Sequence, residues 1–276
     1  MAARETVPID EDTAGALAEG RHADPFAVMG PHRVDGAWWV TAIDPGATEL
    51  SAVTDRGRYP LSRVLGPVFC GPVPDDAPYR LHGRGPEGED WTHDDAYRFG
   101  PVLTDHDEYL LAEGSHHRLW EALGAHVMTH EGTAGTHFAV WAPNAQRVSV
   151  VGDFDAWDGR RHVMRRRGGS GVWEIFVPGV GDGARYKYEV IGRDGALHMK
   201  ADPVGFGAEH PPATASVVRD LRGYRWDDDG WMETRAAHNR RDAPISVYEV
   251  HLGSWKRVHE EGGRPLSYRE MAEELI

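Results

Sequence analysis

The sequence predicts a mostly β chain, with two β-sandwich modules in tandem followed by the first strand and helix of a further domain. Glycine and proline supply 33 and 18 of the 276 residues, and this density of turn formers favours short strands over a helical bundle. Two long stretches contain short apolar runs that stop at turn signals. The last stretch instead joins one strand pattern to one helix pattern.

Composition excludes several classes of protein. The net charge of −14 argues against a nucleic-acid binder, which needs a basic face. No apolar run approaches the roughly 18–20 residues that span a bilayer, so no membrane partner is expected. A single cysteine, Cys70, excludes an internal disulfide framework and a thiolate metal cluster. We therefore expect a cytoplasmic protein.

The first half of the chain divides into three predicted parts. Residues 1–22 are small and polar and are predicted to form an N-terminal tail or one loose helix at residues 13–19. Residues 23–104 are predicted to form the first β-sandwich, because residues 37–43 are apolar and stop at a turn signal. Residues 105–124 are predicted to be a helical connector. Its apolar residues suit one helical face: Tyr109, Leu110, Leu119, Trp120 and Leu123.

Residues 125–222 give stronger strand signals and predict a second β-sandwich. Alternating runs cover residues 172–177 and 185–190, and residues 192–195 supply a hairpin turn. The two sandwiches resemble copies of one another, because residues of the same type recur at a constant offset. At an offset of 98, Pro45, Ala47, Ser51 and Val53 match Pro143, Ala145, Ser149 and Val151. At an offset of 107, Tyr79, Asp95 and Phe99 match Tyr186, Asp202 and Phe206. Chance alignment of similar text is the alternative.

The end of the chain changes character. Residues 223–244 are predicted to be a polar connector, and residues 245–252 a strand. Ser267 and Glu270 then have the spacing of a capping box at the start of a helix. One strand and one helix cannot bury their apolar faces alone. Residues 245–276 are therefore expected to be the first β-α unit of a truncated domain.

Three residues are candidates for saccharide binding, in which aromatic planes stack on sugar rings. Trp157 is predicted to lie in a loop, and Lys187 on the opposite strand face from Tyr186 and Tyr188. Trp91 is predicted to lie in a loop of the first module. The alternatives are that Trp157 caps the core, that Lys187 is merely solvated, and that Trp91 packs against the neighbouring module.

No catalytic or metal site is recognisable in the chain. A glycosidase-type reaction needs two carboxylates about 5 Å apart, and none of the acidic residues falls in a recognisable pair. Asp153, Asp155 and Asp158 have a sparse calcium-loop spacing but lack the downstream glutamate. Tyr248, Glu249 and His251 on the predicted final strand are the nearest approach to a site, with ordinary strand packing as the alternative.

Several motifs together resemble the bacterial glycogen branching enzymes of the α-amylase superfamily. One group resembles the early-set, immunoglobulin-like glycogen-binding module: WAPNA at 141–145, VSVVGDF at 148–154, WDG at 157–159, GVWE at 171–174 and YKYE at 186–189. A second group resembles the start of the catalytic (β/α)8 barrel: YEVHLGSW at 248–255 and LSYRE at 266–270. Residues 94–99 and 114–116 are similar to the extended amino-terminal region of that family.

The resemblance implies the amino-terminal portion of a 1,4-alpha-glucan branching enzyme. Such enzymes cut an α-1,4 bond and pass the glucan to a 6-hydroxyl, using carboxylates on later barrel strands and no metal or organic cofactor. No catalytic residue is therefore assigned to this chain. The implied partners are α-1,4-glucan or glycogen and the missing barrel of the full-length chain. Trp157 and Lys187 would bind glucan, and Tyr248 and His251 would line the active-site cleft.

One position departs from the pattern of related modules. They often carry a second loop tryptophan where this sequence has Leu197, which predicts weak binding at that site and a share of the affinity at Trp91. Two other interpretations stay open. One is a free-standing, non-catalytic glucan-binding protein, and the other is a fragment of a debranching-type enzyme of the same superfamily.

Overall fold

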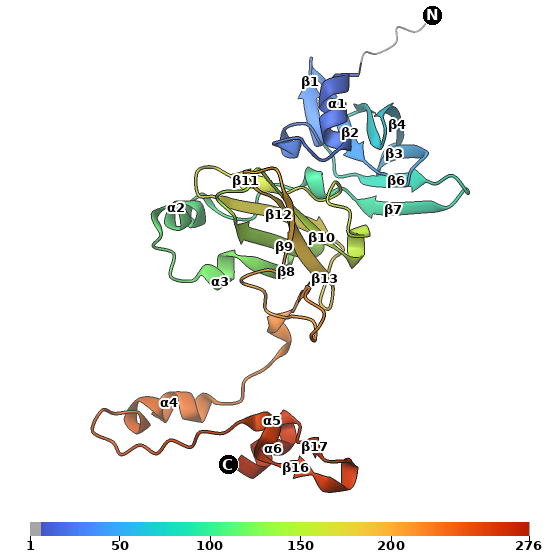
Figure 1. Ribbon diagram of the computed structural model, residues 1–276. Helices are drawn as coiled ribbons and strands as arrows, with labels where there is room; N and C mark the ends of the chain where they lie inside the picture. Colours follow the sequence, from blue (N-terminus) through green and yellow to red (C-terminus); the bar gives the residue numbers. More distant parts are fainter. Residues whose placement is uncertain (1–6, 276) are drawn as a thin grey trace, which may run out of the picture. The chain divides into compact units, whose positions relative to one another are not determined.

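The structure is a computed structural model that describes residues 7–275. It divides into two units, Met1–Gly223 and Tyr224–Ile276. The first unit holds two β-rich modules, and the second holds helices and one short two-stranded ladder (Figure 1). Between residues 7 and 275, every helix is too short or too polar to cross a lipid bilayer.

The first module is one antiparallel sheet of seven strands, ordered β1-β2-β5-β4-β3-β6-β7. The sequence predicts a two-sheet sandwich here, but β4 pairs with β3 through its first half and with β5 through its second. A register shift between Arg63 and Leu65 lets β4 bend, so the two halves form one curled sheet around a shared core. The strands are β1 (Gly30–Val34), β2 (Ala37–Ile43), β3 (Glu49–Thr54), β4 (Gly57–Leu65), β5 (Val68–Val73), β6 (Arg80–Arg84) and β7 (Asp90–Asp94).

The N-terminal segment contains a helix, α1 (Glu11–Ala18), which begins two residues before the predicted one and is packed rather than loose. Asp10 begins it by accepting a hydrogen bond from the Thr13 amide at 2.7 Å. Ala14 and Leu17 are buried in an apolar cluster with residues of β2 and β5. Two buried apolar side chains are enough to pack the helix, because the sheet provides the other apolar residues of the cluster. The sequence of the segment alone does not reveal these partners. Residues 1–6 of the predicted tail lie outside the described residues.

Two helices occupy the predicted connector, α2 (Asp105–Glu113) and α3 (Leu119–Ala122). Thr104 and Asp107 form a capping box at the start of α2, and Gly114 ends it in the left-handed conformation. The connector packs on the second module through a small apolar cluster. Its fully buried members are Leu103, Ala122, Leu123, Ala139 and Val172.

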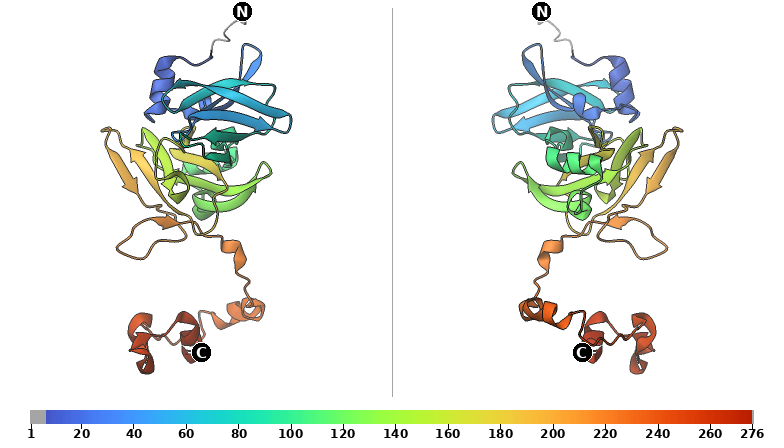
Figure 2. Two further views of the ribbon diagram at one scale, coloured as in Figure 1. Left: turned by 90° about the vertical axis from the view of Figure 1, so that its right-hand side faces the viewer. Right: turned by 90° about the vertical axis from the view of Figure 1, so that its left-hand side faces the viewer.

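The second module is a sandwich of two four-stranded sheets, ordered β11-β12-β9-β8 and β10-β13-β14 with β15 paired to β13 (Figure 2). Its strands are β8 (Gly124–His130), β9 (Thr133–Trp141), β10 (Arg147–Gly152), β11 (Arg165–Arg167), β12 (Val172–Pro178), β13 (Arg185–Ile191), β14 (Leu197–Lys200) and β15 (Ser216–Val217). Inward-facing residues of both sheets build one core, which includes Phe138, Val150, Trp173, Tyr186 and Tyr188.

The second unit differs from its sequence prediction. Residues 245–250 form no strand, and Ile245 and Val247 are 82% and 84% exposed. A strand needs a neighbour for its backbone hydrogen bonds, and none lies beside this segment among residues 224–275. The capping box at Ser267 and Glu270 does form at the start of α6. The elements are α4 (Asp229–His238), α5 (Leu252–Trp255), β16 (Arg257–Val258), β17 (Arg264–Pro265) and α6 (Tyr268–Leu275).

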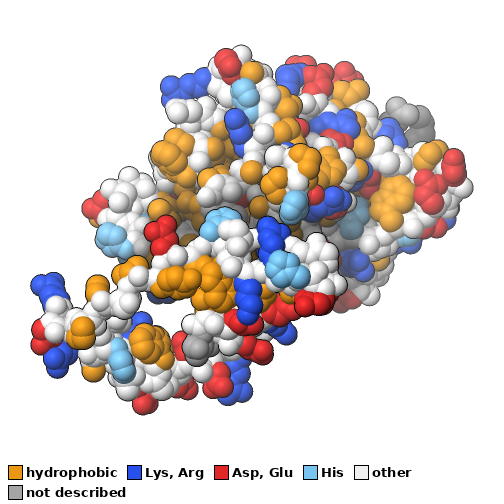
Figure 3. Space-filling view, turned by 60° about the horizontal axis from the view of Figure 1, so that its bottom comes forward, with side chains coloured by type: hydrophobic (Ala, Val, Ile, Leu, Met, Phe, Trp, Pro, Cys, Tyr) orange, Lys and Arg blue, Asp and Glu red, His pale blue; other side chains and the backbone are white. Residues whose placement is uncertain are grey.

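Charged side chains are mixed on the face of the molecule drawn in Figure 3. Acidic and basic groups lie among apolar ones, and the basic groups do not gather into one continuous stripe.

Candidate functional site

A buried carboxylate shapes the loop that carries Trp157. Asp155 ends the short helical turn η3 (Asp153–Asp155), and its Oδ1 accepts hydrogen bonds from the Gly152 amide at 2.9 Å and the Trp157 amide at 3.0 Å. Ala156 and Trp157 both have positive φ, at 58° and 60°. Left-handed backbone is unfavourable for such residues and points to a functional constraint. The loop holds the Trp157 side chain at the surface, 37% exposed.

The edge of the Trp157 ring is tied to an ion pair. Its Nε1 donates to Asp153 at 3.3 Å, and Asp153 accepts two hydrogen bonds from Arg185 at 2.7 and 3.0 Å. This donation from Arg185 lowers the pKa of Asp153. The indole ring of Trp157 is thus held beside the exposed ion pair of Asp153 and Arg185.

Lys187 lies at the same end of the same sheet. It pairs with Val151 across β10 and β13, and Tyr186 pairs with Gly152, whose carbonyl accepts the Trp157 amide. Tyr186 is buried, so Lys187 points outward as predicted, and its Nζ donates to Thr214 Oγ1 at 2.7 Å. An indole plane, an ammonium group and carboxylates on one face can bind a sugar ring and its hydroxyls.

We call this surface the Trp157 face, made of Asp153, Trp157, Arg185, Lys187 and Thr214. The sequence analysis did not identify Arg185 or Thr214 as site residues. Arg185 could have been found from the alternation of β13, because it shares the outward side with Lys187. Thr214 could not, because it reaches Lys187 from a loop 27 residues away. Leu197 is exposed on β14, which flanks β13.

Trp91 lies elsewhere, and its predicted loop position is wrong. It belongs to β7, where it pairs with Gly83 of β6. One face of the indole rests on Gly83, since a Cβ built there would lie 2.5 Å from the ring. Its Nε1 donates to Asp44 at 2.8 Å. The ring is only half-buried and borders a cavity shared with the second module.

Tyr248 and His251 lie in the second unit, and both are exposed. The Tyr248 hydroxyl accepts a hydrogen bond from Trp255 Nε1 at 3.0 Å, and His251 Nδ1 lies 2.8 Å from Ser254 Oγ. All four of these residues belong to the motif at 248–255. Among the described residues, no three His, Cys, Asp or Glu side chains come together as a metal-binding group.

Comparison with known proteins gives two family matches. Residues 10–97 match the amino-terminal domain of the alpha-1,4-glucan branching enzyme GlgB, and residues 122–205 match carbohydrate-binding module 48, the isoamylase N-terminal domain. The first match covers the curled sheet with α1, and the second covers the module with the Trp157 face. The two predicted modules thus match two different protein families.

Curated relatives match almost the whole chain. A 1,4-alpha-glucan branching enzyme GlgB from Roseobacter denitrificans is 57% identical over 97% of this chain and 38% of its own length. The corresponding proteins of Paramagnetospirillum magneticum and Ralstonia nicotianae are 52% and 50% identical, over 97% and 100% of this chain. The chain spans 36% and 39% of those two relatives.

Proposed function

We infer that this chain belongs to the family of the GlgB 1,4-alpha-glucan branching enzymes, whose amino-terminal region it matches, and that it holds and positions glucan for such an enzyme. The enzyme would form α-1,6 branches by moving an α-1,4-glucan segment to a 6-hydroxyl. The observation that carries the proposal is the Trp157 face, four of whose five residues lie inside the part that matches a carbohydrate-binding module: Asp153, Trp157, Arg185 and Lys187. Its indole plane is held by a loop whose backbone is left-handed at Ala156 and Trp157, and such preorganisation favours ligand binding.

Glucan retention tests this role of the Trp157 face. We expect this chain to be retarded in gels that contain glycogen, and Trp157→Ala and Lys187→Ala to migrate faster. Trp120→Ala is the matched control, because Trp120 is also exposed but lies on α3. Unchanged mobility for Trp157→Ala and Lys187→Ala would refute this role of the Trp157 face. Unchanged mobility for Trp91→Ala as well would refute glucan binding through all three predicted residues.

The transfer chemistry is proposed to lie outside these 276 residues. The chain spans under two fifths of its relatives, and none of its acidic residues matches the catalytic motifs of the family. Incubated with amylose, this chain is expected to create no α-1,6 linkages, measured by debranching and chain-length analysis. Measurable branching would overturn the placement.

The second unit is proposed to be the beginning of the catalytic barrel. The motif at 248–255 supports this, together with the formed capping box at Ser267. Tyr248 and His251 would then line the glucan cleft when the rest of the barrel is present. In a full-length relative, replacing the tyrosine that matches Tyr248 by alanine is expected to lower branching while leaving retention on glycogen intact.

A further inference from the structure

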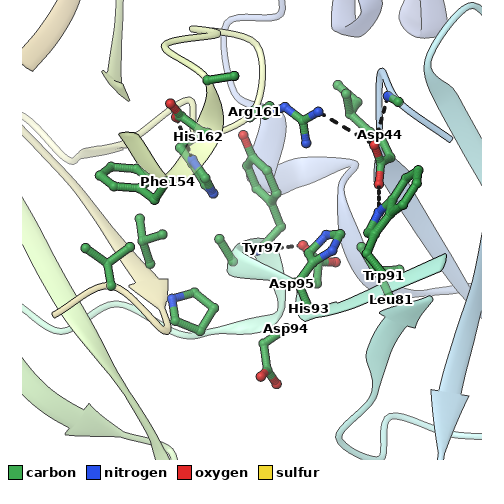
Figure 4. A pocket seen from close by; sticks show the side chains of 18 of the residues that line it. Asp44, Leu81, Trp91, His93, Asp94, Asp95, Tyr97, Phe154, Arg161 and His162 are labelled. Atoms are coloured by element: carbon green, nitrogen blue, oxygen red, sulfur yellow. Dashed lines mark hydrogen bonds and ion pairs between the residues drawn. The ribbon is translucent and has the colours of Figure 1, made fainter. Parts of the chain in front are cut away.

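A cavity of about 500 Å³ lies between the two modules of the first unit. One wall comes from β7 and the turn after β2, with Asp44, Trp91 and His93. The opposite wall comes from the Trp157 loop and the end of β12, with Phe154 and His162 (Figure 4). Trp157 itself does not line it. Small-molecule sites commonly have volumes of about 300–1,000 Å³ and lie between domains.

The polar groups of the cavity are fixed in place before any ligand arrives. Asp44 is almost wholly buried, accepts from Trp91 Nε1, and lies 3.7 Å from Arg161 of the second module. His162 Nδ1 lies 2.9 Å from Asp155, the carboxylate that also shapes the Trp157 loop. Such preorganised groups bind a ligand without an ordering cost.

His93 is the group that these contacts leave available. It shares the Trp91 side of β7, borders the cavity, and its imidazole has no hydrogen-bond partner within residues 7–275. Burial lowers the pKa of His93, so the ring is neutral at pH 7. A neutral imidazole has one donor and one acceptor, which matches a hydroxyl group.

The charge of the lining selects among small ligands. Five acidic side chains border the cavity against a single arginine, Arg161; they are Asp44, Glu89, Asp94, Asp95 and Asp155. A phosphorylated sugar would meet repulsion there. Between these groups lie apolar side chains, namely Met29, Ile43, Leu81, Val177 and Val180. A ligand with apolar C–H faces and many hydroxyls satisfies both parts of the lining.

We propose that this inter-module cleft is a second saccharide site, separate from the Trp157 face, and that it takes a short uncharged α-glucan against Trp91 and His93. The choice of an uncharged polyhydroxylated ligand comes from the lining alone, and the choice of α-glucan rests on the proposed function. A ligand in the cleft touches both modules and therefore couples them. Its binding is expected to raise the unfolding temperature of the two modules together.

Glycine at position 46 allows a test that removes no side chain. A Cβ built there would lie 3.6 Å from the Trp91 ring, an ordinary contact, and the backbone is not left-handed. Gly46→Leu therefore extends over the ring and fills the cleft. Gly169→Leu is the matched control, because a Cβ at Gly169 meets nothing within 4 Å and Gly169 is outside the cleft.

The experiment follows the indole N–H signals of this chain by NMR during titration with maltotriose, and separately with glucose 1-phosphate. We expect the Trp91 signal to shift with maltotriose and not with glucose 1-phosphate. Gly46→Leu is expected to weaken the Trp91 response by about ten-fold or more, with the Trp157 response kept, and Gly169→Leu to change neither.

Each contrary result identifies what fails. A static Trp91 signal beside a shifting Trp157 signal overturns the cleft and leaves the proposed function standing. Equal responses of Trp91 to maltotriose and glucose 1-phosphate overturn the selection of an uncharged ligand. If neither tryptophan responds to maltotriose, the cleft and the proposed glucan binding fail together.

Discussion

Glu174 is a single buried residue that joins the segment before α2 to the second module. One oxygen accepts hydrogen bonds from the Val102 and Leu103 amides, both at 3.0 Å, and the other accepts from Arg167 at 2.8 Å. His137 Nε2 lies 2.9 Å from the first oxygen. Burial tends to raise the pKa of Glu174, but these donors outweigh it and hold the pKa below its usual value. The carboxylate therefore stays ionised inside the protein.

Replacing that carboxylate tests its contribution to stability. Glu174→Gln turns one acceptor oxygen into an NH2 group, which faces either the amides or Arg167 as a second donor. We expect a loss of about 3 kcal/mol in the free energy of unfolding, as for other broken buried pairs, measured by urea denaturation. Glu108→Gln is the control, because Glu108 pairs with the same Arg167 at 3.2 Å but lies at the edge of the protein. An equal loss in both variants would contradict this role.

His137 links the same cluster to pH. Its side chain is buried, and burial, against the opposing influence of Glu174, holds the pKa of His137 below its usual value. As the pH falls, the unfolded chain therefore binds a proton at His137 at a higher pH than the folded chain does. The stability that neutral His137 contributes is complete above about pH 6.5 and is lost as the pH falls from there toward the folded-state pKa.

His137→Gln is therefore expected to flatten the dependence of unfolding free energy on pH between about 5 and 7. Urea midpoints at several pH values give the slope for each protein. His106→Gln, on the exposed start of α2, is the comparison and should leave the slope unchanged. If His137→Gln keeps the full slope, the proton uptake belongs to another group.

At the scale of elements, one hydrogen bond recurs in both modules. Tyr79 donates to Asp95 at 2.5 Å in the first, and Tyr186 donates to Asp202 at 2.6 Å in the second. Both pairs are buried, and each aspartate also accepts a backbone amide two residues on. The offset of 107 seen in the sequence thus joins structurally equivalent positions. The strand pairs beside them keep that offset too, because β6 pairs with β7 as β13 pairs with β14.

The two copies should nevertheless respond differently to loss of the phenol. Asp202 also accepts from the Tyr188 hydroxyl at 3.2 Å, whereas within residues 7–275 Tyr79 supplies the one tyrosine hydroxyl that donates to Asp95. Tyr79→Phe is therefore expected to cost more stability than Tyr186→Phe, within about 1–3 kcal/mol for a buried acceptor that loses its donor. Urea unfolding of both variants gives the order. A larger loss for Tyr186→Phe would show that the second phenol does not compensate.

Sequence patterns within a short segment predicted the features that depend on that segment alone. The alternation of residues 185–190 predicted β13 and the outward direction of Lys187, and the spacing of Ser267 and Glu270 predicted a cap that forms. Trp91 was beyond such reasoning. Its burial depends on a glycine beneath the ring and on Asp44, a partner 47 residues away. The same holds for the cleft, whose walls come from different modules.

For the whole molecule, the informative segment is residues 245–250, predicted as a strand and found without one. In these 276 residues we expect their amides to exchange with deuterium as fast as those of an unfolded peptide, while β12 is protected. The physical reason is the lack of a neighbouring strand within 224–275.

Adding a neighbouring strand is expected to make residues 245–250 form a strand. This chain can be joined to the remaining residues of the relative from Roseobacter denitrificans, which is 57% identical to it. If the second unit begins a barrel, as proposed, the added residues supply a strand that pairs with the backbone N–H and C=O groups of residues 245–250. Amides 245–250 are then expected to gain protection of at least about ten-fold, measured by mass spectrometry, and Ile245 and Val247 to become buried. Protection already present in the shorter chain would argue against this dependence. A chimera that branches amylose while these amides still exchange freely would show that the segment is not a barrel strand, because the barrel would then be complete without it.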